Sequence, residues 1–197
     1  MNVRLIKKFQ FQSILVSERY HDPAVINNYS ATVHMTTVSD MAAEQNKAYN
    51  RIAYWMSMMQ DCVFIDQHNK IIDAWEKTGA RIMAFPEDPV DQLVGMMLYS
   101  KLSAILEGRI EINEVLISSA MDDDIIYQQN EHENLGPFSN PGWWNDAKPI
   151  WETAKKKSGK VISLQRTAEW SDLELDWDDD QDDNVVLVAD FPKDENK

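Results

Sequence analysis

The sequence contains a single cysteine, Cys62, among 197 residues. One thiol excludes an intrachain disulfide, and such sparse cysteine usage is typical of proteins in a reducing cytosol. The chain also lacks an apolar run of the roughly 20 residues that a membrane-spanning helix needs. Its first twelve residues, MNVRLIKKFQFQ, have no continuous apolar segment of the kind found in secretion signals. We therefore expect a soluble cytoplasmic protein that has no association with a membrane.

Histidine is scarce, and basic residues are outnumbered. The four histidines, His21, His34, His68 and His132, have no spacing typical of metal ligands, so we expect neither a metal nor another cofactor. The net charge of −14 argues against simple electrostatic binding to nucleic acid or anionic lipid. The charge is uneven, however. Residues 169–197 hold 12 acidic and two basic residues, a net of −10, which leaves only −4 for residues 1–168.

The segment from 85 to 120 contains the clearest pattern in the chain. Pro86 and Pro89 flank two acidic residues, a combination that favours the start of a helix. Apolar residues then recur at the spacing of one buried helix face: Val90, Leu93, Val94, Met97, Leu98, Leu102, Ile105 and Leu106. After Gly108, a typical C-terminal cap, alternating apolar residues from 110 to 117 predict a strand. The pattern predicts a long helix docked on a sheet.

The flanking segments complete an α+β fold. Residues 3–17 and 29–38 are predicted to be strands antiparallel to each other, with a connection at 18–28. Helices are expected from about 40 to 60 and from about 67 to 77. Residues 81–85 form a short apolar passage of undefined type, and 125–128 a possible last strand. We expect an antiparallel β-sheet with helices packed on one face.

This order of elements resembles the tunnelling fold (T-fold) of the pterin and queuosine-pathway synthases. Phe9 to Ser13 (FQFQS) resembles their opening strand, and Ile65 to Asn69 (IDQHN) resembles their Leu-Asp-His segment. Pro86 to Leu106 and Glu114 to Ile117 resemble the helix and strand that follow. The resemblance implies a T-fold core at 1–128 that oligomerises through its strands into a β-barrel. A Trp/Lys-rich arm at 129–168 and a mobile acidic tail at 169–197 would follow this core.

Functional residues of those synthases are missing. The second strand offers only His34 where the family has a His-x-His zinc pair, and Ser119 falls near the position of its substrate-anchoring Glu. Cys62 is expected at the end of a helix, away from the position of the family's catalytic Cys. The resemblance therefore implies a T-fold without the enzyme. An enzyme of pterin or 7-deazaguanine metabolism is the less favoured alternative.

A T-fold of this size with an acidic tail also resembles the phage single-stranded-DNA-binding RNA polymerase cofactors of the Drc type. That resemblance implies a homo-oligomer in the infected bacterial host cell, which binds single-stranded DNA with little sequence preference. It further implies a role in phage transcription or replication together with a phage RNA polymerase.

Basic and aromatic residues occur together in three places, as a single-stranded-DNA site requires. The predicted nucleic-acid-binding residues are Lys7 and Lys8 in the first strand, Lys47 and Arg51 in the first helix, and Trp143, Trp144, Lys148, Lys155, Lys156, Lys157 and Lys160 in the arm. Phe9, Phe11, Tyr54 and Trp55 fit core packing better than base contact, and the lysine run also fits a solvated helix end. Trp143 and Trp144 follow Pro-Gly in a loop, which favours exposed stacking; docking on their own or a neighbouring subunit is equally compatible.

The C-terminal tail is predicted to bind a partner. Its residues for this role are Asp178, Asp179, Asp180, Asp182, Asp183 and Phe191. Asp190-Phe191-Pro192 resembles the acidic-then-aromatic ends of single-stranded-DNA-binding proteins, and the polyanion could occupy a basic groove in the absence of DNA. A solubilising end is the alternative. A DNA mimic or host-protein inhibitor is another, although a mimic usually spreads its carboxylates over a rigid surface.

Overall fold

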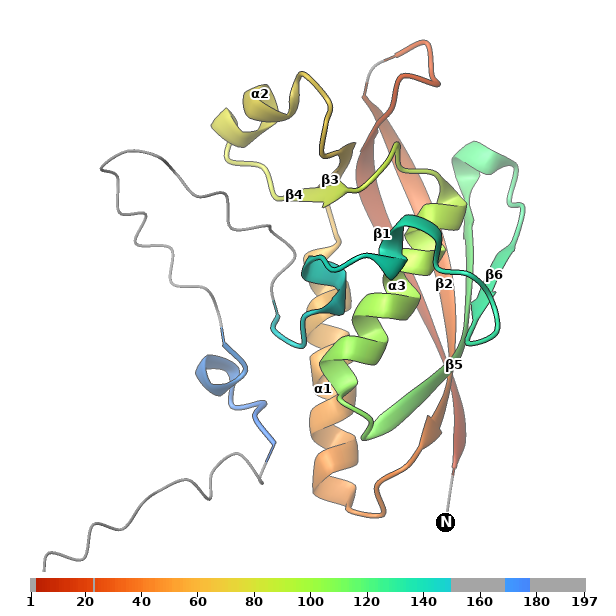
Figure 1. Cartoon of the computed structure of the whole chain (residues 1–197), viewed down its shortest axis with the longest axis vertical. Coiled ribbons are helices and arrows are strands. Elements are labelled where there is room, and N and C mark those ends of the chain that lie inside the picture. The colour runs from red at the N-terminus through yellow and green to blue at the C-terminus, as the bar shows by residue number, and fades with distance from the viewer. Residues whose placement is uncertain (1–2, 23, 150–168, 178–197) are drawn as a thin grey trace, which may run out of the picture.

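The computed structural model describes residues 3–22, 24–149 and 169–177. A six-stranded sheet with the strand order β4-β3-β1-β2-β5-β6 organises them (Figure 1). The sheet is open, with β4 and β6 at its edges. The architecture is mixed α+β. No helix of the described residues is long and apolar enough to cross a membrane.

Four strands form the antiparallel part of the sheet. β1 (Arg4–Val16) and β2 (Val25–Thr37) are both 13 residues long and pair along almost their whole length. β5 (Ile110–Ser119) pairs with β2, and β6 (Tyr127–Asn130) pairs with β5. These strands confirm the predicted ones, but β2 begins four residues earlier than expected. Residues 25–28 belong to the strand because they pair with residues 12–15 of β1; Asn27 among them is buried, and its side-chain carbonyl accepts a hydrogen bond from the Met121 amide.

The other two strands correct the prediction of a purely antiparallel sheet. β3 (Cys62–Asp66) is parallel to β1, and β4 (Ile82–Phe85) is parallel to β3. Cys62 therefore starts a strand, and the second helix, α2 (Ile72–Lys77), is shorter than expected. β3 was missed because its residues are buried on both faces, which gives a continuous apolar run instead of alternation.

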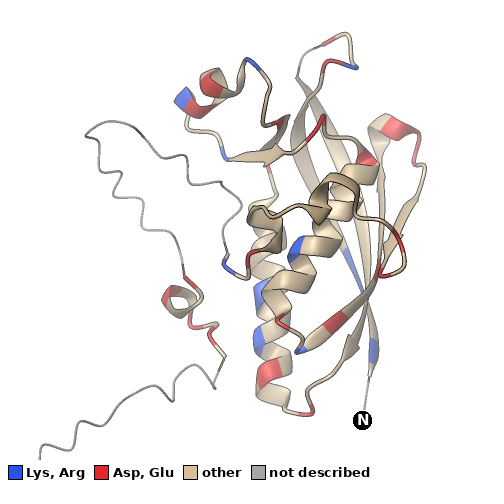
Figure 2. Ribbon diagram, in the orientation of Figure 1, with Lys and Arg blue, Asp and Glu red and all other residues tan. Residues whose placement is uncertain are grey.

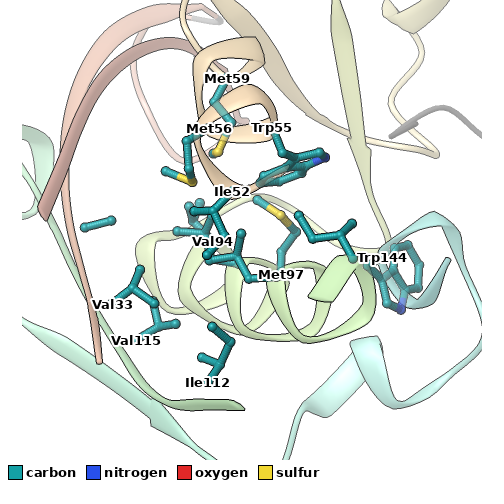
Figure 3. Packing of buried hydrophobic residues seen from close by; sticks show 14 of the residues in the cluster. Val33, Ile52, Trp55, Met56, Met59, Val94, Met97, Ile112, Val115 and Trp144 are labelled. Atoms are coloured by element: carbon teal, nitrogen blue, oxygen red, sulfur yellow. The ribbon is translucent and has the colours of Figure 1, made fainter. Parts of the chain in front are cut away.

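The main core lies between the sheet and two helices, α1 (Ala42–Met58) and α3 (Asp91–Leu106) (Figures 1 and 3). Gly95 of α3 lets the helix approach β5, since a Cβ there would lie 2.9 Å from Ile117 Cγ2. After α3 the chain turns through left-handed backbone at Glu107 and Gly108, as the predicted cap requires. α2 does not share this face. Its Ile72 packs with Val63 and Ile65, whose side chains point away from the main core.

The arm and part of the predicted tail pack against the helices. Short 3-10 turns at Gly136–Ser139 and Trp143–Asn145 contact α3, and Trp143 stacks on Trp55 of α1. Residues 169–177 lie against α1, where Trp170 meets the ring of Tyr54 edge-on. These segments cover the helices on the surface that the sheet leaves free.

Candidate functional site

Lys7 and Lys8 lie on opposite faces of β1. Both side chains are exposed, but successive residues of a strand point to opposite sides. Lys7 shares the helix-covered face with Phe9, and its ammonium lies 5.4 Å from the centre of that ring. Lys8 points to the uncovered face. The two lysines therefore do not belong to one patch, although their adjacency in the sequence had indicated that they would.

Arg51 is not available to a ligand in this structure. Its side chain is 1% exposed, because it lies under the segment 169–177. It donates hydrogen bonds to the backbone carbonyls of Leu175 (2.8 Å) and Ile105 (3.1 Å) and to the Glu107 carboxylate (2.6 Å). The prediction that Arg51 contacts DNA is corrected: it is a structural cation. Lys47, one turn earlier on α1, is half-buried.

Two tryptophans enclose the Arg51 guanidinium. The ring centres of Trp177 and Trp170 lie 3.7 Å and 4.7 Å from its central carbon, and both rings are buried. The indole of Trp177 also donates to the Glu107 carboxylate. We call Arg51, Glu107, Trp170 and Trp177 the arginine clasp. It corrects the predicted start of the mobile tail, because residues 169–177 are packed on the body; Asp178, Asp179, Asp180, Asp182, Asp183 and Phe191 lie outside the described residues.

Trp143 and Trp144 are buried, at 4% and 5% exposed. The Trp143 indole donates to the carbonyl of Ala84 in β4, and the Trp144 indole donates to the carbonyls of Phe138 and Asn140. Figure 3 shows Trp144 beside α3 in the apolar cluster. The expectation of exposed stacking rings is thus corrected in favour of its alternative, docking on the chain's own body. The reason is that each indole has both an apolar surface to bury and a carbonyl within reach of its N–H.

Lys101 of α3 is a functional candidate that the sequence reading did not select. It is fully buried, and its ammonium donates to the carbonyls of Trp143 (3.0 Å), Asp146 (2.6 Å) and Lys148 (2.8 Å). Burial lowers the pKa of Lys101 to about 7, and the Asp146 carboxylate opposes this shift. Its position four residues from both Met97 and Ile105 marks it as part of the buried stripe. Arg51 falls in the same way between Ala48 and Trp55.

Lys148 is exposed and makes an ion pair with Glu169, with 2.8 Å between Nζ and Oε1. This contact raises the pKa of Lys148. The Trp170 indole donates to the carbonyl of Ala147 at the same place. The chain therefore leaves the described part at Pro149 and re-enters it at Glu169 beside Lys148. The predicted contacts Lys155, Lys156, Lys157 and Lys160 lie between these points in the sequence and outside the described residues.

The face of β1, β2 and β5 that points away from α1 and α3 is covered by α2 only at the end of β1, where Ile14 and Val16 pack in the cluster of Ile72; within the described residues no helix lies over the rest of this face. Ile6 and Ile26 on this face are 64% and 61% exposed, whereas Leu5 and Asn27, their neighbours on the other face, are half-buried and buried. Ile14 and Leu116 on this face are half-buried, and the other side chains are mainly basic, hydroxyl or amide groups on β1 and β2, with acidic groups on β5. We call this surface the open face. It is a surface that the fold leaves free for a ligand.

A cluster of buried polar residues lies at the start of α3, on the helix-covered side of the sheet. Asn27, Tyr29, Asp91 and Ser119 are each less than 5% exposed, and each has a buried polar atom with no hydrogen-bond partner among the described residues. Burial raises the pKa of the Asp91 carboxyl; Ser119 partly opposes this shift, and the Asp122 carboxylate adds to it. Ser119 is thus a buried residue beside a carboxylate, at the position where the resemblance implied an anchoring Glu.

The histidines are far apart in the fold. His34 lies on β2, 3.4 Å from a Glu114 oxygen, whereas His21, His68 and His132 are in exposed loops. In the described ranges, no group of three or more His, Cys, Asp and Glu side chains is placed to hold a metal ion.

Several solved structures resemble this fold. They include the uncharacterized protein WS1659 from Wolinella succinogenes, 11% identical with a TM-score of 0.48, covering 66% of this chain and 99% of that one. The 6-pyruvoyl tetrahydropterin synthase of Plasmodium vivax is 9% identical, with a TM-score of 0.42 over 66% of this chain and 99% of the enzyme. The synthase of Caenorhabditis elegans is 14% identical, with a TM-score of 0.37 over 66% and 96%. At such values the likeness assigns no activity to this chain. No protein-family model matches the sequence, and no curated protein is significantly similar to it.

Proposed function

We propose that this protein is a non-enzymatic, sequence-tolerant single-stranded-DNA-binding protein built on a T-fold. The observation that carries the proposal is the open face, a long sheet surface without a helix over most of it, on which Lys8 lies among amide and hydroxyl side chains. Single strands are bound by surfaces that combine cations for the backbone with aromatic rings on which the bases stack. On the open face, amide and hydroxyl side chains would contact the bases in place of such rings. Sheet faces serve this purpose in several nucleic-acid-binding folds.

The distribution of charge supports this choice of face. Arg4 and Lys8 are four residues apart on β1, which separates their Cα atoms by about 13 Å along the strand. Figure 2 shows basic residues at the start of β1 and along α1 and α3. Of the helix cations, however, Arg51 and Lys101 are buried under the arm and residues 169–177. β1 therefore offers exposed cations on a surface that the fold leaves open.

The open strand edges support assembly into a homo-oligomer. β1 pairs with β3 only from Ser13 to Val16, so no described strand pairs with that edge of residues 4–11. The outer edge of β6 is likewise without a strand partner among the described residues. We propose that the free edge of β1 joins β6 of the next subunit. Repetition of such a contact closes a ring, here a β-barrel, and removes exposed edges that otherwise invite aggregation. Light scattering should give a multiple of the chain mass, and a monomer at all concentrations would contradict this assembly.

The polymerase partner follows from the resemblance alone. We propose that the acidic tail, with Asp178 to Asp183 and Phe191, contacts a phage RNA polymerase. A pulldown of that polymerase by the full chain and by residues 1–177 tests this part separately. Equal capture by both forms would place the contact on the body.

DNA binding is tested by fluorescence anisotropy of labelled oligo-dT across a salt series, with the variants Lys8→Gln and Lys7→Gln. The two changes remove the same charge at adjacent exposed positions, and they differ in the face that they affect. We expect Lys8→Gln to weaken binding several-fold at low salt and to reduce the salt slope by about 0.7, the value for one phosphate contact of a single strand. Lys7→Gln should have little effect. Absence of binding by the unmodified protein at low salt would end the proposal.

A further inference from the structure

The open face contains a hollow of about 490 Å³ that crosses the strands. Its walls include Gln10 and Gln12 of β1, Asn28 and Ser30 of β2, and Ser118 of β5. These residues are direct neighbours across the sheet, since Gln10 lies opposite Ser30, Ser30 opposite Ser118, and Gln12 opposite Asn28. The polar part of the lining is thus a continuous row of amides and hydroxyls, and Phe11, Tyr29 and Ala120 complete the walls.

One side of the hollow is fixed by hydrogen bonds between its own residues. The Gln12 amide group donates to Asp61 (3.2 Å), as does the amide group of Gln60 (3.0 Å). The side-chain oxygen Oε1 of Gln60 in turn accepts from the Gln12 backbone N–H (3.1 Å). By contrast, the side chains of Gln10 and Asn28 are exposed and have no hydrogen-bond partner within the described residues. Two free carboxamides therefore stand beside a preordered wall.

The charge of the residues that line the hollow decides whether the phosphate or the base of a nucleotide fits there. No lysine or arginine lines the hollow, and Asp124 contributes a carboxylate at one end, so a phosphate would be repelled. A neutral group with hydrogen-bond donors and acceptors on its edge is the complementary ligand. A carboxamide offers both a donor and an acceptor and can rotate to present either one. Gln10 and Asn28 could in this way serve the edge of any base.

We infer that this hollow is a nucleobase subsite. A base of the bound strand lies in it, with its polar edge hydrogen-bonded by Gln10 and Asn28. The backbone passes over Lys8, which is two residues from Gln10 on the same face. This inference rests on the proposed DNA binding and adds the position and chemistry of one contact.

The test compares the double variant Gln10→Ala/Asn28→Ala with the matched control Gln92→Ala/Asn46→Ala, which removes one exposed Gln and one exposed Asn from α3 and α1. The probes are labelled oligo-dT and an oligonucleotide of the same length with abasic sugars. We expect the double variant to bind oligo-dT about tenfold more weakly than the control does, as two lost hydrogen bonds imply. Its affinity for the abasic strand and the salt slope should be unchanged, because no phosphate contact is lost.

The outcomes separate the two proposals. If the unmodified protein does not bind oligo-dT, the proposed function fails and the subsite fails with it. If it binds and the double variant binds as tightly as the control, the hollow is not a base site and the proposed function stands. Equal loss for both probes, or a smaller salt slope, would identify a backbone contact and overturn the inference.

Discussion

The arginine clasp leads to the sharpest prediction about stability, the effect of Arg51→Met. Methionine fills a similar length but cannot donate to Leu175, Ile105 or Glu107. The Glu107 carboxylate would lose a cation that lies 2.6 Å away, and two indole faces would lose the guanidinium between them. We therefore expect both weaker folding and release of residues 169–177.

The magnitude follows from the exposure of the remaining partner. Removing one member of a buried ion pair costs about 3–5 kcal/mol, because the other charge remains without compensation. The Glu107 side chain is 37% exposed and can be hydrated, which favours the lower end, about 3 kcal/mol. With a urea dependence of about 2 kcal/mol per molar, the unfolding midpoint should fall by about 1.5 M. Arg51→Lys should lower the free energy of unfolding by a smaller amount, since lysine keeps the charge but lacks the planar guanidinium with its several N–H donors.

Urea unfolding and limited chymotrypsin digestion measure the two effects. Lys47→Met is the control, because it removes a cation from the same helix at a half-buried position. In Arg51→Met, mass spectrometry should detect early cleavage after Trp170 or Trp177, before the body is cut. If Arg51→Met is no less stable than Lys47→Met, or if residues 169–177 stay protected, the clasp does not hold this segment.

Three further predictions concern other buried contacts. Lys101 has a pKa of about 7 in the folded state and an ordinary pKa in the unfolded chain. Above pH 7 the folded state therefore binds fewer protons than the unfolded state, so the free energy of unfolding should rise with pH, by at most about 1.4 kcal/mol per pH unit. The difference in urea midpoint between the unmodified chain and Lys101→Met should therefore grow from pH 7 to 9; a constant difference would mean that Lys101 stays protonated on its three carbonyls. Gly95→Ala should destabilise by about 1–2 kcal/mol despite the better helix propensity of alanine, because its Cβ would meet Ile117, and an unchanged melting temperature would refute the close approach. Residues 1–168 should be less stable than residues 1–177 by several kcal/mol, since the shorter chain loses the burial of Trp170 and Trp177 and their contacts with Arg51, and equal midpoints would contradict the docked segment.

The strongly periodic elements could be predicted from the sequence. β1, β2, α1 and β5 each have one buried and one more exposed side, and α3 has a regular apolar repeat although nearly all of its residues are buried or half-buried; these patterns give both type and approximate bounds. β3 could not be predicted in this way, because a strand that is buried on both faces has the same apolar run as part of a helix. Because β3 was not predicted, its parallel pairing with β4 was not predicted either.

The predicted site residues differ from the observed arrangement for a different reason. Sequence proximity grouped Lys7 with Lys8, and composition grouped Trp143 and Trp144 with the lysines of the arm. The alternation of a strand already sends the first pair to opposite faces, but only the fold shows which face the helices cover and that both tryptophans are buried. A basic residue within an apolar stripe, as at Arg51 and Lys101, indicates a buried cation with specific partners. Its partners are carbonyls and rings more than 40 residues away, which no local pattern identifies.

The arginine clasp also changes how the net charge is divided between the body and the C-terminal tail. Since residues 169–177 belong to the body, the tail begins at 178 and carries a net −6 of the total −14. Its origin is fixed as well: the Trp177 ring lies 4.9 Å from the Arg109 guanidinium, and the Arg109 carbonyl accepts a hydrogen bond from the Val38 amide at the end of β2. Thr37, next to Val38, donates to the Val3 carbonyl at the start of β1. The acidic segment thus starts at the end of the sheet where Arg4 lies, so an effect of the tail on ligand binding should act first on the cations of β1. Removal of residues 178–197, and not of 169–197, isolates that effect from the stability of the fold.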